Sequence, residues 1–436
     1  MLKRKLVLVA FWVLTSTVLG LVFGVFLAEK DLSAVYKRAE VAKNEGLPKL
    51  EITLGETTLS EVLSKSKYER YGASEVVLKN KGEEISLGSG ELKGRGNSTW
   101  GLEKSPFQIK LDKKADILGL GERKKWVLLA NYFDEAAGLR NDFAFKLAEV
   151  LGEKYAEKGE FVELYVNDQY EGLYYLVRKI EIGKNSVDIR GPGAVLAEFD
   201  SLHGSWEDYA LSENGSLFVF KDAVSEKDEE KFLEAKQEFL KRISEFERAV
   251  LDKHYKKAEE LVDFTSLAEY YLVNEFSVNP DGYSSSYYFY TDGGGDKINV
   301  GPVWDFDFAF ANRRWVWKRI EDFYSPEKTM VRSEDVLADL PMSGMIYRLM
   351  DYPVFRAEVW RVYQEKMAGK AEELLEYFDE KKEEIARAAY SDRARYYSNY
   401  NQTFEEATSE LREYVRRRLE YFEKVYVLPT DIKIMW

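Results

Sequence analysis

The most continuous apolar stretch of the chain is an uncharged run of 23 residues, from Leu6 to Ala28. As a helix this run would be ~35 Å long, which is enough to cross the hydrocarbon core of a bilayer. A basic cluster at residues 3–5 precedes it, and the positive-inside rule keeps such a cluster in the cytoplasm. We therefore expect a cytoplasmic tip and transmembrane anchor over residues 1–29, a stalk over 30–48, and the large domain on the outer face. A cleaved signal peptide, which would give a secreted protein, and a buried core helix are the alternatives.

After the stalk, short β-rich runs divided by glycine and asparagine indicate strands and hairpins. The runs occupy residues 75–78, 85–87, 107–111, 161–166 and 172–177, with further candidates at 195–199 and 216–220. In the run at 107–111, apolar and polar residues alternate, which predicts one buried and one polar face. An amphipathic helix is expected over residues 135–151, ending at Gly152. These elements predict a β-rich lobe over residues 49–200.

The later part of the chain shows helical periodicity instead. Phe232, Phe239 and Phe246 are spaced seven apart on a highly charged segment, which is typical of a helix with one core-facing stripe. Residues 355–426 repeat the pattern, and their apolar side is formed by Leu411, Val415, Leu419, Phe422 and Tyr426. The three arginines at residues 416–418 are interpreted as part of the solvated face.

A β-rich segment followed by a helix-rich one predicts an α+β protein of two lobes. The second, helical lobe is expected over residues 201–436. A cleft between two such lobes is a common place for a ligand.

Composition narrows the chemistry that this cleft can perform. Lys and Arg number 63 and Asp and Glu 77, so the formal net charge is −14, which argues against nucleic acid as a partner. The chain has no cysteine and only two histidines, His203 and His254. Thiol catalysis, cysteine-built zinc sites and three-histidine metal sites are therefore excluded, and neither histidine lies in a recognisable triad motif. We expect the chemistry to depend on carboxylates, lysine and arginine.

The first dense motif lies at residues 93–100, where two glycines flank Arg95. Glycine lets the backbone approach a ligand closely, and Arg95, Asn97 and Ser98 offer donors of the kind that bind phosphate oxygens. A tight hairpin turn capped by Asn97 and Ser98 is the structural alternative. Lys104 and Lys110 follow, and a lysine that emerges from a strand into a cleft neutralises nucleotide phosphates, unless it is simply solvated.

The other dense motifs carry aspartates. Asp281 follows an apolar helical stretch at a Pro-Asp-Gly turn, a position that aspartate also occupies for structural reasons alone. Asp305 and Asp307 stand two apart in an apolar, aromatic run, where buried carboxylates need a cation in compensation. The alternative for these two is the polar face of a strand. Together the three aspartates favour a base and a Mg²⁺ ligand that share one cleft.

Taken together, these motifs resemble the CotH kinase family, the spore coat protein H group of atypical protein kinases. The resemblance rests on the segments 93–100 (KGRGNSTW), 104–110 (KSPFQIK), 139–142 (LRND), 170–174 (YEGLY), 279–282 (NPDG) and 302–307 (PVWDFD). They occur in the family's order and cover nearly all of the chain after the stalk. The run Trp-Asp-x-Asp after an Asp-Gly loop is their most specific part.

The resemblance implies a distant protein-kinase-like fold that transfers the γ-phosphoryl group of ATP to Ser or Thr of a protein substrate, with Mg²⁺ or Mn²⁺. It implies that Asp281 orients the acceptor hydroxyl, that Asp305 binds the metal, and that Asp307 is a second ligand. The implied nucleotide contacts are Arg95, Asn97, Ser98, Lys104, Lys110 and Lys179.

Two positions depart from the family pattern. Ser286 stands where many relatives have an asparagine for the second metal contact, and Arg178 stands where glutamate is common, next to the expected edge of the nucleotide. The helix acid that would pair with Lys110 is either Asp142 or Glu149, which share a helix face.

The first functional hypothesis is therefore an ATP- and Mg²⁺-dependent Ser/Thr kinase domain anchored outside the membrane. Because ATP is scarce outside a cell, a catalytically weak kinase-like module that binds a surface protein or glycan is the second hypothesis, supported by the 29 tyrosines and nine tryptophans. A glycoside hydrolase that uses Asp281 and Asp305 is the third.

Overall fold

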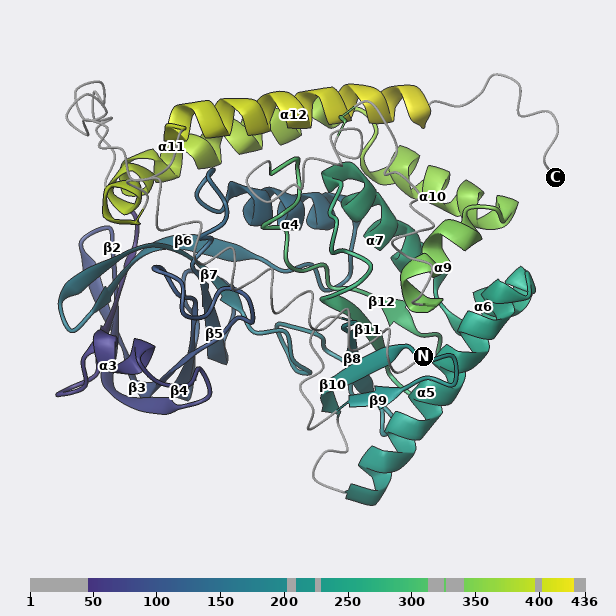
Figure 1. The fold of residues 1–436 in the computed structure, drawn as a ribbon, viewed down its shortest axis with the longest axis horizontal. Coiled ribbons are helices and arrows are strands. Elements are labelled where there is room, and N and C mark those ends of the chain that lie inside the picture. Colours follow the sequence, from purple (N-terminus) through teal and green to yellow (C-terminus); the bar gives the residue numbers. More distant parts are fainter. Residues whose placement is uncertain are drawn as a thin grey trace, which may run out of the picture.

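The computed structural model describes residues 46–201, 209–223, 229–312, 325–326, 341–396 and 402–426. The predicted tip and anchor at residues 1–29, and the stalk up to residue 45, lie outside these ranges. None of the helices in the described ranges is long and apolar enough to cross a bilayer. The described chain is a mixed α+β structure, as the sequence predicts (Figure 1).

The first part of the chain is a closed seven-stranded barrel with the strand order β1-β2-β3-β4-β5-β7-β6. The strands are β1 (Lys49–Thr53), β2 (Arg70–Asn80), β3 (Glu83–Gly94), β4 (Phe107–Ala115), β5 (Arg123–Leu129), β6 (Gly159–Val166) and β7 (Gln169–Arg178). Neighbouring strands are antiparallel except β1 and β6, whose parallel pairing closes the barrel. A short helix, α3 (Leu59–Leu63), joins β1 to β2 and is capped by Thr58.

Alternation along the strands fills the barrel with apolar side chains. In β4, Phe107, Ile109 and Leu111 are buried, which confirms the face predicted from the sequence. They pack with Trp126 of β5 and Leu176 of β7 in a core that belongs to the barrel alone. Each residue removed from water here contributes on the order of 1.5–3 kcal/mol, so the barrel has its own source of stability.

A second sheet has the strand order β12-β11-β8-β10-β9. Its strands are β8 (Val195–Phe199), β9 (Tyr209–Leu211), β10 (Leu217–Ala223), β11 (Tyr287–Thr291) and β12 (Asn299–Val300). The fully buried central strand β8 pairs with β10 on one side and β11 on the other. The sheet therefore combines strands from both sides of residue 200, the expected boundary between the lobes.

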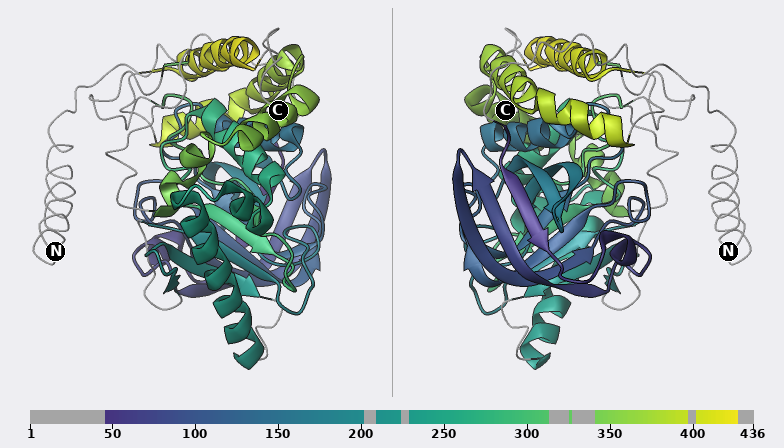
Figure 2. Two further views of the ribbon diagram at one scale, coloured as in Figure 1. Left: turned by 90° about the vertical axis from the view of Figure 1, so that its right-hand side faces the viewer. Right: turned by 90° about the vertical axis from the view of Figure 1, so that its left-hand side faces the viewer.

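Helices lie above this sheet and along its right-hand side in Figure 1, and others cover one side of the barrel (Figures 1 and 2). They are α4 (Leu139–Leu151), α5 (Glu229–Leu251), α6 (Tyr255–Leu261), α7 (Phe264–Ser277), α9 (Pro341–Leu349), α10 (Pro353–Lys366), α11 (Ala371–Tyr396) and α12 (Phe404–Val425). Helix α4 starts later than predicted, because Gly138 adopts φ +100° and precedes the first helical residue. It ends at Gly152 as expected, with φ +90° in a left-handed C-cap.

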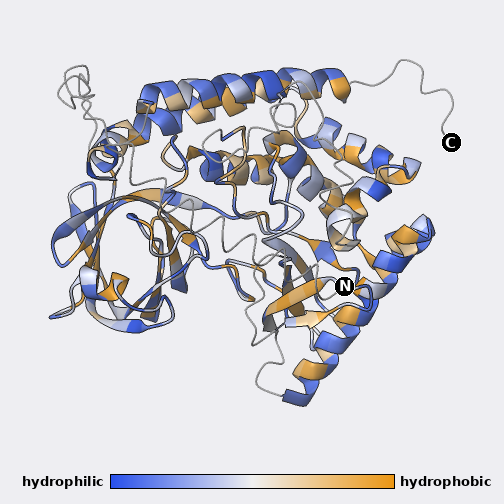
Figure 3. Cartoon of the chain, in the orientation of Figure 1, coloured by the Kyte–Doolittle hydropathy of each residue, from blue (hydrophilic) through white to orange (hydrophobic). Residues whose placement is uncertain are grey.

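The predicted helical stripes are confirmed. Phe239 and Phe246 of α5 are buried, and Phe239 packs against Phe218 and Phe220 of β10. The apolar side predicted for the last helix is buried along its length. Its outer face, and that of α11, is hydrophilic (Figure 3). The prediction for Arg418 is wrong, however, since this side chain is completely buried at the inner side of α12.

Candidate functional site

A cavity of about 390 Å³ lies where the barrel meets the second sheet. Its walls come from the loop after β3, the end of β7, strands β8 and β10, the turn before β11, and the segment 304–308. This volume is within the range of small-molecule and cofactor sites. The sequence predicts a ligand cleft between two lobes, and this cavity lies between the barrel and the second sheet.

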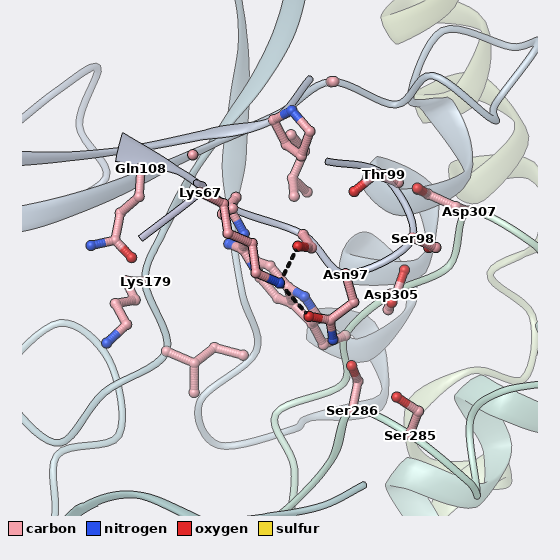
Figure 4. A pocket seen from close by; sticks show the side chains of 18 of the residues that line it. Lys67, Asn97, Ser98, Thr99, Gln108, Lys179, Ser285, Ser286, Asp305 and Asp307 are labelled. Atoms are coloured by element: carbon pink, nitrogen blue, oxygen red, sulfur yellow. Dashed lines mark hydrogen bonds between the residues drawn. The ribbon is translucent and has the colours of Figure 1, made fainter. Parts of the chain in front are cut away.

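Asp305 and Asp307 form the acidic side of the cavity (Figure 4). They alternate with Trp304 and Phe306, which are buried and pack on Phe145 of α4 at centroid distances of 5.7 and 6.4 Å. Because the aromatic rings anchor every second residue, both carboxylates face the cavity. Asp305 adopts φ +66°, a left-handed backbone conformation that is uncommon for a non-glycine residue and occurs at turns and at functional sites.

Asn141 of α4 fixes this acidic segment. Its side-chain oxygen accepts a hydrogen bond from the Phe306 amide at 2.9 Å, and its Nδ2 donates to Asp307 Oδ1. Asp305 is solvent-accessible and Asp307 is half-buried, but the surrounding protein atoms displace water from both and raise their pKa values. The charge of Asp281 raises the pKa of Asp305 further, and the charge of Asp305 raises that of Asp307. Two neighbouring carboxylates whose pKa values are raised in this way favour the binding of a cation next to them.

The donor set suits Mg²⁺ or Mn²⁺ shared with a phosphorylated ligand. It consists of the two carboxylates and the hydroxyl of Ser286, which also lines the cavity and adopts φ +52°. Within the described ranges, no three acidic or histidine side chains gather closely enough to hold a metal by themselves. Mg²⁺ usually binds through one or two carboxylates, waters and substrate phosphates, so these residues fit that mode rather than an all-protein cage.

Asp281 lies beside the acidic side, in the loop that follows α7. The loop turns at Val278, whose φ of +48° ends the helix, and the Asp281 carbonyl accepts hydrogen bonds from the amides of Ser284 and Ser285 at 2.9 and 3.0 Å. Gly282 is required here, because a Cβ would lie 2.1 Å from the side-chain oxygen of Asn274. Asp281 is half-buried and close enough to Asp305 for its charge to affect the pKa of that residue.

Five cations of the described chain line the cavity, and three of them, Lys93, Arg95 and Lys179, form what we call its basic side. The side chains of these three have no hydrogen bond or ion pair with any residue that the structure describes. Burial lowers the pKa of all three, and neighbouring cations lower it further for the two lysines, bringing Lys179 to about 8. The Arg95 guanidinium lies 5.5 Å from the ring centroid of Trp304, next to the acidic side.

The loop that carries Arg95 is held over the cavity by Lys67. The Lys67 ammonium donates to the Gly96 carbonyl at 2.6 Å and to the side-chain oxygen of Asn97 at 2.7 Å, and Figure 4 shows both bonds. Asn97 and Ser98 are exposed at the rim of the cavity. The motif at 93–100 therefore forms one wall of a site, although its turn is also structurally fastened.

The family model for the CotH kinase protein matches residues 92–422. The chain belongs to the CotH kinase family. The match begins near the end of β3, just before the loop of Arg95, and includes the segments of Asp281 and Asp305. The family's kinase-like function therefore concerns the part of the chain that supplies most of the cavity lining. No curated protein matches the sequence.

The family motif at residues 104–110 begins with Lys104, which we expected to contact a nucleotide in the cleft. Lys104 is only 2% exposed and does not line the cavity. Its ammonium lies 2.7 Å from Asp392 Oδ1 of α11 and donates to the Leu173 carbonyl at 2.5 Å. Gly172 belongs to the same contact, since a Cβ there would lie 2.2 Å from Asp392 Oδ1. These residues attach α11 to the barrel.

Lys110 is also outside the cavity. Its side chain is 42% exposed on the outer face of β4, with its ammonium 3.8 Å from Glu91. Neither of the expected helix acids pairs with it. Asp142 accepts hydrogen bonds from the hydroxyls of Tyr175 and Tyr377, and Glu149 pairs with lysines near its own helix.

Arg178, which departs from the family pattern, makes structural contacts outside the cavity. It forms an ion pair with Glu157 at 3.2 Å and donates to the carbonyls of Ala156 and Asn185 at 3.1 and 3.0 Å. These contacts hold it away from the cavity, while the next residue, Lys179, faces into it.

Sequence reasoning missed several residues of the site. Glu198 and Asp200 line the cavity from β8 and its end, and Glu198 forms an ion pair with Lys221 of β10. A carboxylate inside the strand Val195–Phe199, which is otherwise apolar, was the available signal, because such a group is costly to bury without a purpose. Lys67 offered no such signal, since it precedes β2 in an ordinary polar stretch.

Proposed function

We propose that this CotH family member is an ATP- and Mg²⁺-dependent kinase that phosphorylates Ser or Thr of a protein substrate. One observation supports the proposal above the others: three cations that form no hydrogen bond or ion pair within the described ranges and two aspartates with raised pKa values line the same cavity. A ligand that carries both a polyphosphate and a divalent cation satisfies both sides at once.

The basic side has the charge that a triphosphate requires. Lys93 emerges at the end of β3, Lys179 follows β7, and Arg95 lies on the loop between β3 and β4. The positive charges of these three side chains repel one another, and negatively charged phosphate oxygens between them would offset this repulsion. We assign the phosphate-neutralising role to Lys93, Arg95 and Lys179, in place of Lys104 and Lys110. Asn97 and Ser98 are positioned to cover the phosphates from the rim.

The acidic side holds the metal in this proposal. Asp305 and Asp307 supply carboxylate ligands, and Ser286 supplies a hydroxyl where relatives have an asparagine. When bound, Mg²⁺ or Mn²⁺ would neutralise the charge that develops on the transferring phosphoryl group. Asn141 keeps Asp307 in place, since its amide donates directly to that carboxylate.

Asp281 is proposed to orient the acceptor hydroxyl. It stands on the loop next to Asp305 but does not line the cavity, so it can reach an incoming serine without binding the nucleotide. The same basic side favours the kinase over a glycoside hydrolase, because a neutral sugar does not require three neighbouring cations.

The proposal is tested with the purified protein, labelled ATP, Mg²⁺ and a Ser/Thr-rich acceptor protein. We expect phosphate incorporation by the wild type and a loss on the order of 10²- to 10⁴-fold for Asp281→Ala, as for removal of a positioned base. Nucleotide affinity should remain near normal in this variant. Binding of ATP without any transfer would favour the kinase-like binding module, and hydrolysis of oligosaccharides without nucleotide would favour the hydrolase.

We also propose that residues 1–29 anchor the domain to the membrane, with the kinase domain on the outer face. The support is the apolar length and the basic cluster before it. Removal of residues 1–29 changes the formal charge from −14 to −16, because three basic residues and Glu29 leave (60 − 76). The full chain should appear in the membrane fraction and the shortened chain in the soluble fraction. An insoluble, unfolded shortened chain would indicate instead that the segment packs in the core.

A further inference from the structure

Arg418 is a fully buried arginine on α12, far along the chain from the candidate site. Its Nε donates to the Phe276 carbonyl at 3.0 Å, and its Nη2 donates to the Glu275 carbonyl. The same Nη2 lies 3.3 Å from Glu275 Oε1, which supplies a counter-charge. The guanidinium also lies 4.9 Å from the ring centroid of Phe422. Such a side chain is held by contacts on several sides.

The carbonyls that Arg418 contacts belong to the last turn of α7. A helix leaves its last carbonyls without intrahelical partners, and here those of Glu275, Phe276 and Ser277 each have another donor. Arg418 donates to the carbonyls of Glu275 and Phe276, and the Phe310 amide donates to the Ser277 carbonyl at 2.6 Å. One residue earlier, the Asn274 carbonyl accepts from the Asn279 amide at 3.2 Å. A cation at this end also interacts favourably with the helix dipole.

This helix end leads directly into both halves of the candidate catalytic machinery. The chain continues from Ser277 through the left-handed Val278 to Asp281. The bond from Phe310 connects the same turn to the segment that carries Asp305 and Asp307. Arg418 is the side chain that fixes this shared point from outside.

We infer that Arg418 is a positioning residue of the transfer reaction, holding the end of α7 so that Asp281 faces the metal-binding aspartates. The inference rests on the proposed kinase function, and it makes α12 part of the catalytic architecture. Removal of the guanidinium takes a donor from two buried carbonyls, those of Glu275 and Phe276, and the turn shifts to expose them to water.

The test compares Arg418→Met with Arg416→Met in the full chain. Arg416 lies two residues away on the same helix but is solvent-accessible and pairs with Glu413 and Glu420 of α12 itself, so it is a matched control. We expect Arg418→Met to lower kcat by about tenfold or more, equivalent to ~1.4 kcal/mol, with ATP affinity within about twofold. Arg418→Lys should recover part of kcat, because an ammonium can still donate to the carbonyls. Arg416→Met should behave as the wild type.

Hydrogen exchange provides a readout that does not require activity. The amides of Ser284 and Ser285 donate to the Asp281 carbonyl. Their hydrogen-exchange rates should therefore be higher in Arg418→Met than in the wild type, and equal to the wild-type rates in Arg416→Met. This result would support the positioning role even if the chain transferred no phosphate, in which case the proposed function alone would fail.

Unchanged kcat and unchanged exchange in folded Arg418→Met would overturn the inference. So would a parallel loss of kcat, ATP affinity and melting temperature that Arg418→Lys did not restore. If the methionine variant does not fold, Arg418→Lys decides alone: a fall in kcat without a fall in ATP affinity supports the role, and unchanged kcat contradicts it.

Discussion

The side-chain amide of Asn279 donates a hydrogen bond to the backbone carbonyl of Asp305 over 3.1 Å. The oxygen of the same amide accepts from the Asp281 amide at 3.2 Å. One side chain therefore connects the residue proposed to orient the acceptor with the residue proposed to bind the metal. This connection explains why an asparagine precedes the Pro-Asp-Gly turn.

Asn279→Ala removes both bonds and should uncouple the two loops. We expect kcat to fall by about tenfold, since each lost hydrogen bond contributes roughly 0.5–1.5 kcal/mol. Asn299→Ala is the control, because that side-chain amide donates to the Lys297 carbonyl of its own hairpin. Steady-state kinetics of the two variants would decide; equal kcat values would refute the connection.

The reassignment of the phosphate contacts gives a second prediction. Lys93→Met and Lys179→Met should each weaken ATP binding by about tenfold or more, because a charge-assisted hydrogen bond contributes roughly 1.5–3 kcal/mol. Lys110→Met, on the outer face of β4, should leave affinity unchanged. Calorimetry of the three variants measures this, and a loss confined to Lys110→Met would restore the original assignment.

The lowered pKa of Lys179 predicts a pH dependence of nucleotide binding. Its pKa is about 8, so the side chain is largely charged at pH 7 and largely neutral at pH 9. ATP affinity should therefore fall as the pH rises through this range, and the fall should be smaller in Lys179→Met. A pH profile that is the same in both proteins would show that Lys179 does not contact the phosphates.

Lys104→Met should affect stability rather than binding. The substitution leaves Asp392 buried without its partner, which typically costs about 3–5 kcal/mol. Urea unfolding should show this loss, while ATP affinity of the folded variant should equal that of the wild type. A stable variant with weak ATP binding would place Lys104 in the nucleotide site after all.

Buried acids predict how stability depends on pH. Burial raises the pKa of Asp142 to about 6, above its ordinary value of 3.8, so the folded protein holds a proton there that the unfolded chain loses. The free energy of unfolding therefore decreases as the pH rises from about 4 to 6. Asp142→Asn keeps an acceptor for the hydroxyls of Tyr175 and Tyr377 and removes the titration.

We expect Asp142→Asn to stabilise the protein by on the order of 1–3 kcal/mol at pH 8, from about 1.4 kcal/mol per pKa unit, and by less at pH 5. Unfolding curves at the two pH values measure the difference. A gain that does not change with pH would show that the carboxyl does not titrate between them.

Local patterns predicted most of the fold, because burial follows periodicity. The alternation at Phe107 and the stripe at Leu411 are both confirmed, since each depends only on near neighbours in the chain. Closure of the barrel depends on the parallel contact between β1 and β6, which no local pattern records.

The candidate site divides in the same way. The sequence pattern identified Asp305 and Asp307 as carboxylates in an apolar run, and the structure places both in the cavity. The sequence pattern could not show that Lys104 forms an ion pair with Asp392, because that contact joins distant parts of the chain. Arg418 had a usable signal: it stands three residues after Val415 and four before Phe422, on the apolar stripe itself, so helical spacing already placed it inside.

The central claim is that one cavity binds a triphosphate on its basic side and a divalent cation on its acidic side. Calorimetric titration of ATP with and without Mg²⁺, on the wild type and on Asp305→Asn, tests it most directly. We predict that Mg²⁺ strengthens ATP binding by about tenfold or more in the wild type and has little effect in Asp305→Asn, because the neutral amide removes a metal-binding charge. ATP affinity that is independent of Mg²⁺ in the wild type, or equally enhanced by Mg²⁺ in both proteins, would contradict the account.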